Sequence, residues 1–193
     1  MKDIIKHELE ESSRVKKLLA DSMSDKITEA AQAIYDSIKK GGKVILFGNG
    51  GSAADAQHIA ADLVGRYKLD KGGLPAMALT TDTSVMTAIA NDYGFDKIFS
   101  KQIEAMASKN DVIIAISTSG NSSNVIEGIQ AAKKMGIKTI GLTGQDGGEL
   151  TKAVDISINV PSKDTPRIQE AHIAIGHIFC YVAEMKTFWG EET

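Results

Sequence analysis

Short apolar runs alternate with helical stretches from residue 43 onward, and this alternation limits the possible folds more than any other feature. The apolar runs span residues 43–47, 75–79, 111–116, 138–142 and 154–160. Such uninterrupted runs are typical of parallel strands that are buried on both faces. The helical stretches between them span 52–66, 82–108 in two pieces, 121–135 and 146–153. Strands that alternate with helices require right-handed crossovers, so we predict an α/β fold with a five-stranded, doubly wound parallel sheet.

The first forty residues are predicted to be helical. Residues 1–40 contain two series of apolar residues at helical spacing, separated by the polar segment 22–25. Glycines at positions 41 and 42 end the second series. We therefore expect two N-terminal helices that cover a surface of their own domain or of another subunit, and we assign oligomerisation to this part of the chain.

A long final helix is expected over residues 165–189. Thr165 provides a cap, and Pro166 occupies the first turn, where proline is tolerated. We find no repeat, low-complexity segment or linker in the sequence. The prediction is therefore a single domain over residues 1–193, with an α/β core over 41–193.

Composition excludes several classes of function. Lys and Arg number 22 against 25 Asp and Glu, and the net charge of −3 argues against nucleic acid as the main partner. A single cysteine forms no internal disulfide, so no oxidising compartment is required. No stretch resembles a signal peptide or a membrane span. We expect a soluble, cytoplasmic protein.

Two loops are candidates for ligand binding. Residues 48–52 and 117–122 each follow a predicted strand and lead into a helix, where glycine, hydroxyl groups and the helix N-terminus favour an anion. Tight turns with ordinary N-caps are the alternative. The spacing of Gly48, Gly50 and Ala53 also fits a dinucleotide fingerprint, but the expected acidic residue is Asp82, 34 positions after Gly48.

Histidines provide the candidates for metal or proton chemistry. His58 and Asp62 are four residues apart on one helix, a spacing that suits a metal site, a proton-transfer pair or an exposed pair without function. On the last helix, His177 lies about 80° from Gln169, and His172 lies about 60° away on the other side. Only one of these two histidines can serve a small site with Gln169, and spacing does not say which.

Four further features are less informative. Arg66 either caps its helix or reaches an anionic ligand, and Asn91-Asp92 reads as a turn between two helices. Cys180 lies among apolar residues and is expected to be a buried, unreactive thiol. His7 is expected to have a structural role.

The motifs together resemble the phosphoheptose isomerase family, which is built on a sugar isomerase (SIS) domain. They span residues 48–58, 91–95, 116–122, 142–144 and 167–172. The resemblance implies a flavodoxin-like sheet and a homotetramer with active sites at subunit interfaces. It also implies the interconversion of sedoheptulose 7-phosphate and D-glycero-D-manno-heptose 7-phosphate in bacterial heptose synthesis, which supplies lipopolysaccharide and capsule precursors.

The resemblance also implies roles for individual residues. The phosphate loop matches Ser117, Thr118, Ser119 and Ser122. Sugar contacts match Asn49, Gly50, Gly51, Ser52, Asn91 and Asp92, and we add Arg66 and Gln169 to the predicted substrate site. One zinc ion per subunit is implied, with ligands matching His58, Asp62, Gln169 and His177, which favours His177 over His172. Asp62 and His177 match the catalytic acid/base pair.

One position departs from the family pattern. The family usually has glutamate where this chain has Asp62, and aspartate is one methylene shorter. A rival class is the SIS adaptors, which are not enzymes and bind the bacterial replication initiator protein. These adaptors lack the carboxylate at position 62 and the histidine at 177, and they carry arginine in place of Ser119. This chain has a carboxylate at position 62, a histidine at 177 and serine at 119, so we predict an enzyme.

Overall fold

In the computed structural model, which describes residues 1–190, five parallel strands form one sheet. Residues 191–193 of the predicted domain lie outside the described residues. The strands are β1 (Val44–Gly48), β2 (Ala76–Ala78), β3 (Val112–Ile116), β4 (Lys138–Gly144) and β5 (Ile156–Val160). Their order across the sheet is β2-β1-β3-β4-β5, which confirms the predicted fold class.

The strand order reverses between β1 and β3. The chain passes from β1 outward to β2, then crosses to β3 on the other side of β1 and continues to β5. Loops at such a reversal leave a crevice outside the carboxyl ends of the strands. Gly48 is paired with Ile116 in the register, so the loops that follow these residues begin side by side. They are the two loops that the sequence predicts to hold a ligand.

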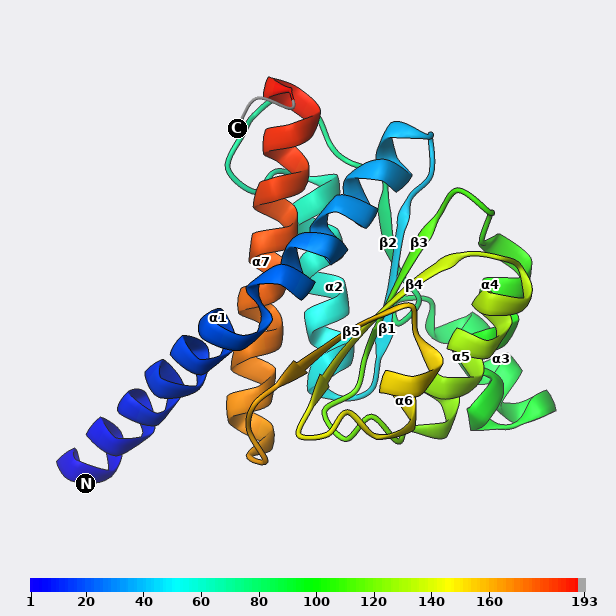
Figure 1. The fold of residues 1–193 in the computed structure, drawn as a ribbon. Helices are drawn as coiled ribbons and strands as arrows, with labels where there is room; N and C mark the ends of the chain where they lie inside the picture. The colour runs from blue at the N-terminus through cyan, green and yellow to red at the C-terminus, as the bar shows by residue number, and fades with distance from the viewer. Residues whose placement is uncertain (191–193) are drawn as a thin grey trace.

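Helices cover both faces of the sheet (Figure 1). One face carries α1 (Lys2–Lys39), α2 (Gly51–Val64) and α7 (Thr165–Trp189). The other carries α3 (Thr83–Tyr93), η1 (Phe95–Lys97), α4 (Ser100–Met106), α5 (Ser123–Lys134) and α6 (Gly148–Ala153). Successive residues of β1 enter the two opposite hydrophobic cores, as the alternation of side chains along a strand requires.

One helix replaces the two that the sequence predicts at the N-terminus, so that prediction was wrong. α1 continues through residues 22–25, where we expected a turn. The hydroxyls of Ser22 and Ser24 donate to the carbonyls of Leu18 and Ala20, at 2.7 and 2.5 Å. This bonding to the preceding turn satisfies both polar side chains without ending the helix.

The N-terminal end of α1 projects beyond the body of the molecule (Figure 1). Ile4, Ile5 and Leu9 are 68%, 56% and 68% exposed, and the buried positions of the helix begin at Ser12. In the part of the chain that the structure describes, no helix combines the length and apolar character needed to cross a membrane.

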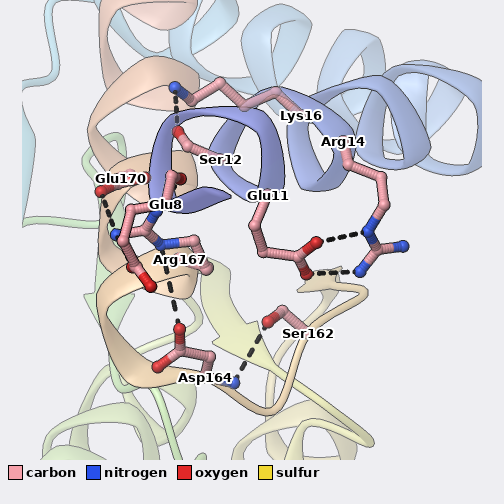
Figure 2. Close-up of polar contacts among 9 residues, drawn as sticks. All are labelled: Glu8, Glu11, Ser12, Arg14, Lys16, Ser162, Asp164, Arg167 and Glu170. Carbon is pink, nitrogen blue, oxygen red and sulfur yellow. Dashed lines mark hydrogen bonds and ion pairs between the residues drawn. The ribbon is translucent and has the colours of Figure 1, made fainter. Parts of the chain in front are cut away.

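Arg167 on α7 joins this projecting helix to the body. Its guanidinium donates to the backbone carbonyl of Glu8 and forms ion pairs with the carboxylates of Glu8, Asp164 and Glu170 (Figure 2). The side chain is nearly buried, so these partners compensate a charge that would otherwise be costly to bury. The cluster therefore fixes the direction in which α1 leaves the core.

α2 and α7 approach each other closely at Gly176. A Cβ atom on this glycine would lie 2.4 Å from Cδ1 of Ile59. Any larger residue would force the Ile59 side chain to shift, so the glycine lets the facing sides of the two helices come close together. His58 and Asp62 lie on α2, and His177 directly follows Gly176 on α7.

Candidate active site

The glycine loop between β1 and α2 packs tightly against its surroundings. A Cβ on Gly48 would lie 2.7 Å from the carbonyl oxygen of Ile116, and Gly50 has a φ of +56°. A Cβ on Gly51 would lie 2.5 Å from Nε2 of Gln169. The loop therefore presents backbone rather than side chains at the crevice. Of its predicted sugar contacts, Asn49, Gly50 and Gly51 are exposed, whereas Ser52 is buried.

A reciprocal amide pair connects the two loops. Asn49 donates to Oδ1 of Asn124 at 2.8 Å, and Asn124 donates to Oδ1 of Asn49 at 2.9 Å. Asn124 is buried in the first turn of α5. The sequence analysis missed this residue, because an asparagine at the start of a helix is also typical of an ordinary cap. The pair sets the distance between the glycine loop and the hydroxyl loop.

The hydroxyl loop, residues 117–122, places its side chains around the N-terminus of α5. The hydroxyls of Ser117 and Ser122 lie 3.2 Å apart, and Ser122 occupies the N-cap without a side-chain capping bond. First-turn N–H groups without such a cap are available to an anion. Ser119 is exposed, and Thr118 is partly exposed. The arrangement suits a phosphate group bound by hydroxyl and amide donors.

Glycine is required within this loop. Gly120 has a φ of +67°, and a Cβ there would lie 1.9 Å from the carbonyl oxygen of Gly147. The backbone N–H of Leu150 also donates to the carbonyl of Gly120, at 2.9 Å. The loop is therefore fixed against the segment that follows β4.

Three side chains from α2 and α7 converge on one point. Nε2 of His58 and Nε2 of His177 lie 3.5 Å apart, and each lies 3.6 Å from Oδ2 of Asp62. Oδ2 of Asp62 is buried and has no hydrogen-bond partner. A buried carboxylate oxygen that faces two imidazole nitrogens is an arrangement that suits a cation.

This triangle has the dimensions of a zinc site. With zinc–nitrogen distances near 2.0–2.1 Å, tetrahedral ligand atoms lie about 3.3–3.4 Å apart, close to the observed spacing. Catalytic zinc sites use three protein ligands and leave one position open for water or substrate. The donor set of two imidazoles and one carboxylate also suits zinc, so the residues fit the implied ion.

Gln169, the fourth predicted ligand, lies elsewhere in the protomer. Its amide packs against Gly51 at the start of α2. Eight residues of helix separate it from His177, which is about 12 Å along the α7 axis. The structure therefore brings Gln169 to the glycine loop, where it is suited to contact a substrate. Its role as a metal ligand stays a prediction.

Burial distinguishes the two histidines that spacing left open. His172 is fully buried, and its Nε2 lies 3.0 Å from the carbonyl oxygen of Thr143. Burial lowers the pKa of His172 to about 4, which keeps the ring neutral. His177 instead joins the convergent group. Cys180 is also buried, and burial raises the pKa of its thiol to about 12, as expected for an unreactive cysteine.

Two predicted substrate contacts, Asn91 and Asp92, lie on the opposite face of the sheet from the convergent side chains. Asn91 and Asp92 belong to the last turn of α3, rather than to a turn between helices as expected, and α3 packs on the opposite face from α2 and α7. Both residues are exposed, and Asn91 donates to the Asp92 carboxylate at 2.8 Å. Arg66 is exposed just after α2.

Asp55 and Tyr67 also border the site, and the sequence analysis missed both. Asp55 lies on the same side of α2 as His58 and Asp62, and its Oδ2 is buried without a partner. Desolvation by burial raises its pKa to about 6. The ring of Tyr67 stacks on His177, with centroids 5.5 Å apart. The helical spacing of Asp55 was visible in the sequence, but the position of Tyr67 depends on an irregular segment.

Known proteins resemble this chain in both sequence and structure. The sequence matches the SIS domain family over residues 9–144. A phosphoheptose isomerase of Aliarcobacter butzleri is 52% identical over 181 residues, which cover 94% of this chain and 95% of that protein. The structure of phosphoheptose isomerase from Neisseria gonorrhoeae is 43% identical, with a TM-score of 0.89, and the match covers 95% of this chain and 98% of that chain. A phosphoheptose isomerase structure from Francisella tularensis is 37% identical, with a TM-score of 0.92 over the same shares.

Proposed function

Because the chain belongs to the phosphoheptose isomerases of the SIS domain family, we propose that it interconverts sedoheptulose 7-phosphate and D-glycero-D-manno-heptose 7-phosphate. The observation that carries this proposal is the convergence of Asp62 and His177, 3.6 Å apart, on the two helices beside the glycine loop. His58 lies seven residues after Gly51, about 10 Å along α2. That separation suits a seven-carbon sugar phosphate with its two ends at the loops and at the convergent side chains.

Aldose–ketose isomerisation moves a proton between C1 and C2 through a cis-enediol. It requires a base at these carbons and a second proton-transfer group at the oxygens. We assign the base to Asp62 and the second group to His177. Oδ2 of Asp62 faces both imidazoles, which leaves Oδ1 to receive the proton. Asp62 is one methylene shorter than the usual glutamate. In this proposal, the close approach of α2 and α7 offsets its shorter reach.

The hydroxyl loop is the proposed phosphate site. Ser117, Thr118, Ser119 and Ser122 supply hydroxyl groups, and the N-terminus of α5 supplies backbone N–H groups and a favourable dipole. Binding energy at the phosphate orients the distant reacting carbons against Asp62. Asn49, Gly50, Gly51, Ser52 and Gln169 are the proposed contacts along the sugar.

Replacing the proposed base tests the mechanism. We expect Asp62→Asn to lower kcat for sedoheptulose 7-phosphate by about a hundredfold or more, since a positioned base contributes at least that factor. Asp25→Asn, an exposed position on α1, is the matched control. Circular dichroism and the elution volume establish that the variant keeps its fold and assembly. Near-normal turnover by Asp62→Asn would exclude Asp62 as the base.

We also propose that one zinc ion binds His58, Asp62 and His177, with Gln169 as the predicted fourth ligand. Bound zinc polarises substrate oxygens as a Lewis acid. The metal-free protein is expected to take up one zinc per protomer in a titration, and His58→Asn is expected to weaken that binding strongly. If activity survives complete metal removal, the zinc proposal fails and the isomerase proposal stands.

We infer a homotetramer, with residues 1–40 providing contacts between subunits and 41–193 forming a single sugar-phosphate-binding domain. The exposed apolar end of α1 supports this inference. An active site at a subunit interface also accounts for Asn91 and Asp92, which lie on the opposite face from the convergent side chains of their own protomer. The net charge of −3 supports a small-molecule ligand rather than nucleic acid. We infer a cytoplasmic reaction, without a membrane partner, that supplies lipopolysaccharide or capsule precursors.

A further inference from the structure

A buried carboxylate on α7 binds three consecutive backbone amides. Glu184 accepts hydrogen bonds from the N–H groups of Tyr67, Lys68 and Leu69, at 2.8, 2.9 and 3.0 Å. Its side chain is only 3% exposed. Successive N–H groups that point at one anion form a nest, which compensates a charge that is otherwise costly to bury. Glu184 therefore determines the path of the chain after α2.

This segment is held by individual contacts rather than by regular structure. α2 ends at Val64, and the chain from there to β2 contains no helix or strand. Lys68 lies over the ring of Tyr181, 4.2 Å from its centroid, which is a second contact between the segment and α7. Loss of the Glu184 carboxylate leaves up to three partly buried backbone N–H groups without their acceptor, so we expect the backbone at Tyr67 to move.

The fixed segment places one side chain against the convergent group. The ring of Tyr67 is stacked on His177, with centroids 5.5 Å apart and an angle of 27° between the rings. Glu184 follows His177 by seven residues, so the two side chains lie on the same side of α7, about two turns apart. The Tyr67 side chain reaches from its backbone, which Glu184 binds, to the imidazole of His177.

We propose that Glu184 and Tyr67 are positioning residues, which hold the His177 ring in the orientation that the reaction and the metal require. Glu184 anchors the backbone of Tyr67, and the Tyr67 ring restricts rotation of the imidazole. This inference rests on the proposed role of His177 and extends it to residues that touch neither substrate nor metal. Groups that orient a metal-binding histidine affect metal affinity or activity by about 10–100-fold when they are removed.

Two variants test the two steps separately. Glu184→Gln keeps the size of the side chain but removes its charge and one acceptor oxygen. Tyr67→Leu removes the ring and leaves the backbone N–H that Glu184 binds. We expect each to lower zinc affinity and kcat by about tenfold, with KM changed less than twofold, because the phosphate site is distant. Zinc affinity is measured by competition with a chromophoric chelator.

A double variant, Glu184→Gln/Tyr67→Leu, shows whether Glu184 acts through Tyr67 or independently of it. If Glu184 acts through Tyr67, Glu184→Gln adds nothing to the loss already present in Tyr67→Leu. Tyr67→Phe retains the ring, and it is expected to recover most of the affinity that Tyr67→Leu loses. Glu104→Gln, at an exposed position on α4, is the matched control for loss of a carboxylate.

The possible outcomes separate this inference from the proposed function. A purely structural Glu184 lowers the melting temperature but leaves zinc affinity and kcat of the folded enzyme unchanged, which overturns the inference. Additive losses in the double variant overturn the coupling between Glu184 and Tyr67. If the unmodified protein neither binds zinc nor converts sedoheptulose 7-phosphate, the proposed function itself fails.

Discussion

Burial raises the pKa of Asp55 above the usual value for an aspartate. Its Oδ2 atom is enclosed without a hydrogen-bond partner, and desolvation raises its pKa from 3.8 to about 6, against a smaller opposing effect of His58. The folded protein therefore binds this proton more tightly than the unfolded chain does. The contribution of Asp55 to the free energy of unfolding is therefore fully present below about pH 4 and is lost as the pH rises through about 6.

An Asp55→Asn variant should reverse this loss. The amide has nearly the same shape and carries no charge at any pH. We expect the variant to melt at a higher temperature than the unmodified protein at pH 8, with the difference shrinking toward pH 4. Thermal unfolding of the metal-free proteins across this range is the measurement. An equal difference at both pH values would contradict the assigned titration.

Gly120 is the residue on which the shape of the hydroxyl loop depends. Its φ of +67° is strained for any other residue, and a Cβ would overlap the carbonyl oxygen of Gly147. We expect Gly120→Ala to lower the free energy of unfolding by about 1–3 kcal/mol. It should also raise KM more than it lowers kcat, because the loop is the proposed site of the phosphate and not of the reacting carbons. Gly72→Ala, a positive-φ position with open space around it, is the control for strain alone.

At the residue scale, helical spacing predicted which side chains could act together, but it did not predict what surrounds each of them. Helical spacing grouped His58 with Asp62, and the structure brings them within 3.6 Å. Spacing left His172 and His177 unresolved, because only packing determines which ring enters the core. The unpaired oxygen of Asp55 and the stacking of Tyr67 likewise depend on tertiary contacts.

At the scale of elements, a pair of amides links the glycine loop to the first turn of α5, directly after the hydroxyl loop. Asn49 and Asn124 exchange hydrogen bonds across the crevice between β1 and β3. Each side chain satisfies the other, so neither can be removed without leaving a polar group unpaired.

Asn124→Ala should therefore affect both loops. We expect the free energy of unfolding to fall by about 1–3 kcal/mol, because the Asn49 amide loses its partner. KM for the sugar phosphate should rise, because the loops lose their fixed spacing. The Asn49→Ala/Asn124→Ala double variant should be hardly less stable than Asn124→Ala alone. Asn110→Ala, at an exposed position outside the site, controls for the loss of an amide.

Elements with a strong pattern were predicted well. All five strands occur where apolar runs predicted them, and α7 spans Thr165–Trp189 as expected. The missing break in α1 has a local cause, since Ser22 and Ser24 bond to the preceding helical turn instead of capping a new helix. These serines are compatible with one continuous helix and with a break between two helices. The packing of α1 on the sheet favours the continuous helix.

At the scale of the whole molecule, α1 extends apolar residues away from the core. Ile5 and Leu9 lie one helical turn apart and are 56% and 68% exposed. Single exposed apolar residues are common, but a row of them on a projecting helix is typical of an interaction surface. The prediction that this surface joins subunits belongs to this scale, because the contacts it requires are made with another copy of the chain.

Charges on this row should disrupt the proposed tetramer. We expect the Ile5→Glu/Leu9→Glu variant to elute as smaller species with a lower mass by light scattering, because burying two carboxylates is costly. His7→Glu places a negative charge on the opposite side of the same helix and should leave the mass unchanged. An unaltered tetramer in the double variant would show that assembly uses another surface.

The uncharged Asn49–Asn124 pair has a consequence for ionic strength. Neither ligand loop contains lysine or arginine, and their spacing is held by neutral amides. Salt weakens exposed charge interactions over a Debye length of about 10 Å at 0.1 M, but it has little effect on such a pair. The protein, with a net charge of −3, also does not attract a phosphate dianion from a distance. Its affinity for substrate should thus change little with salt, as in a site that captures its ligand by fit rather than by long-range attraction.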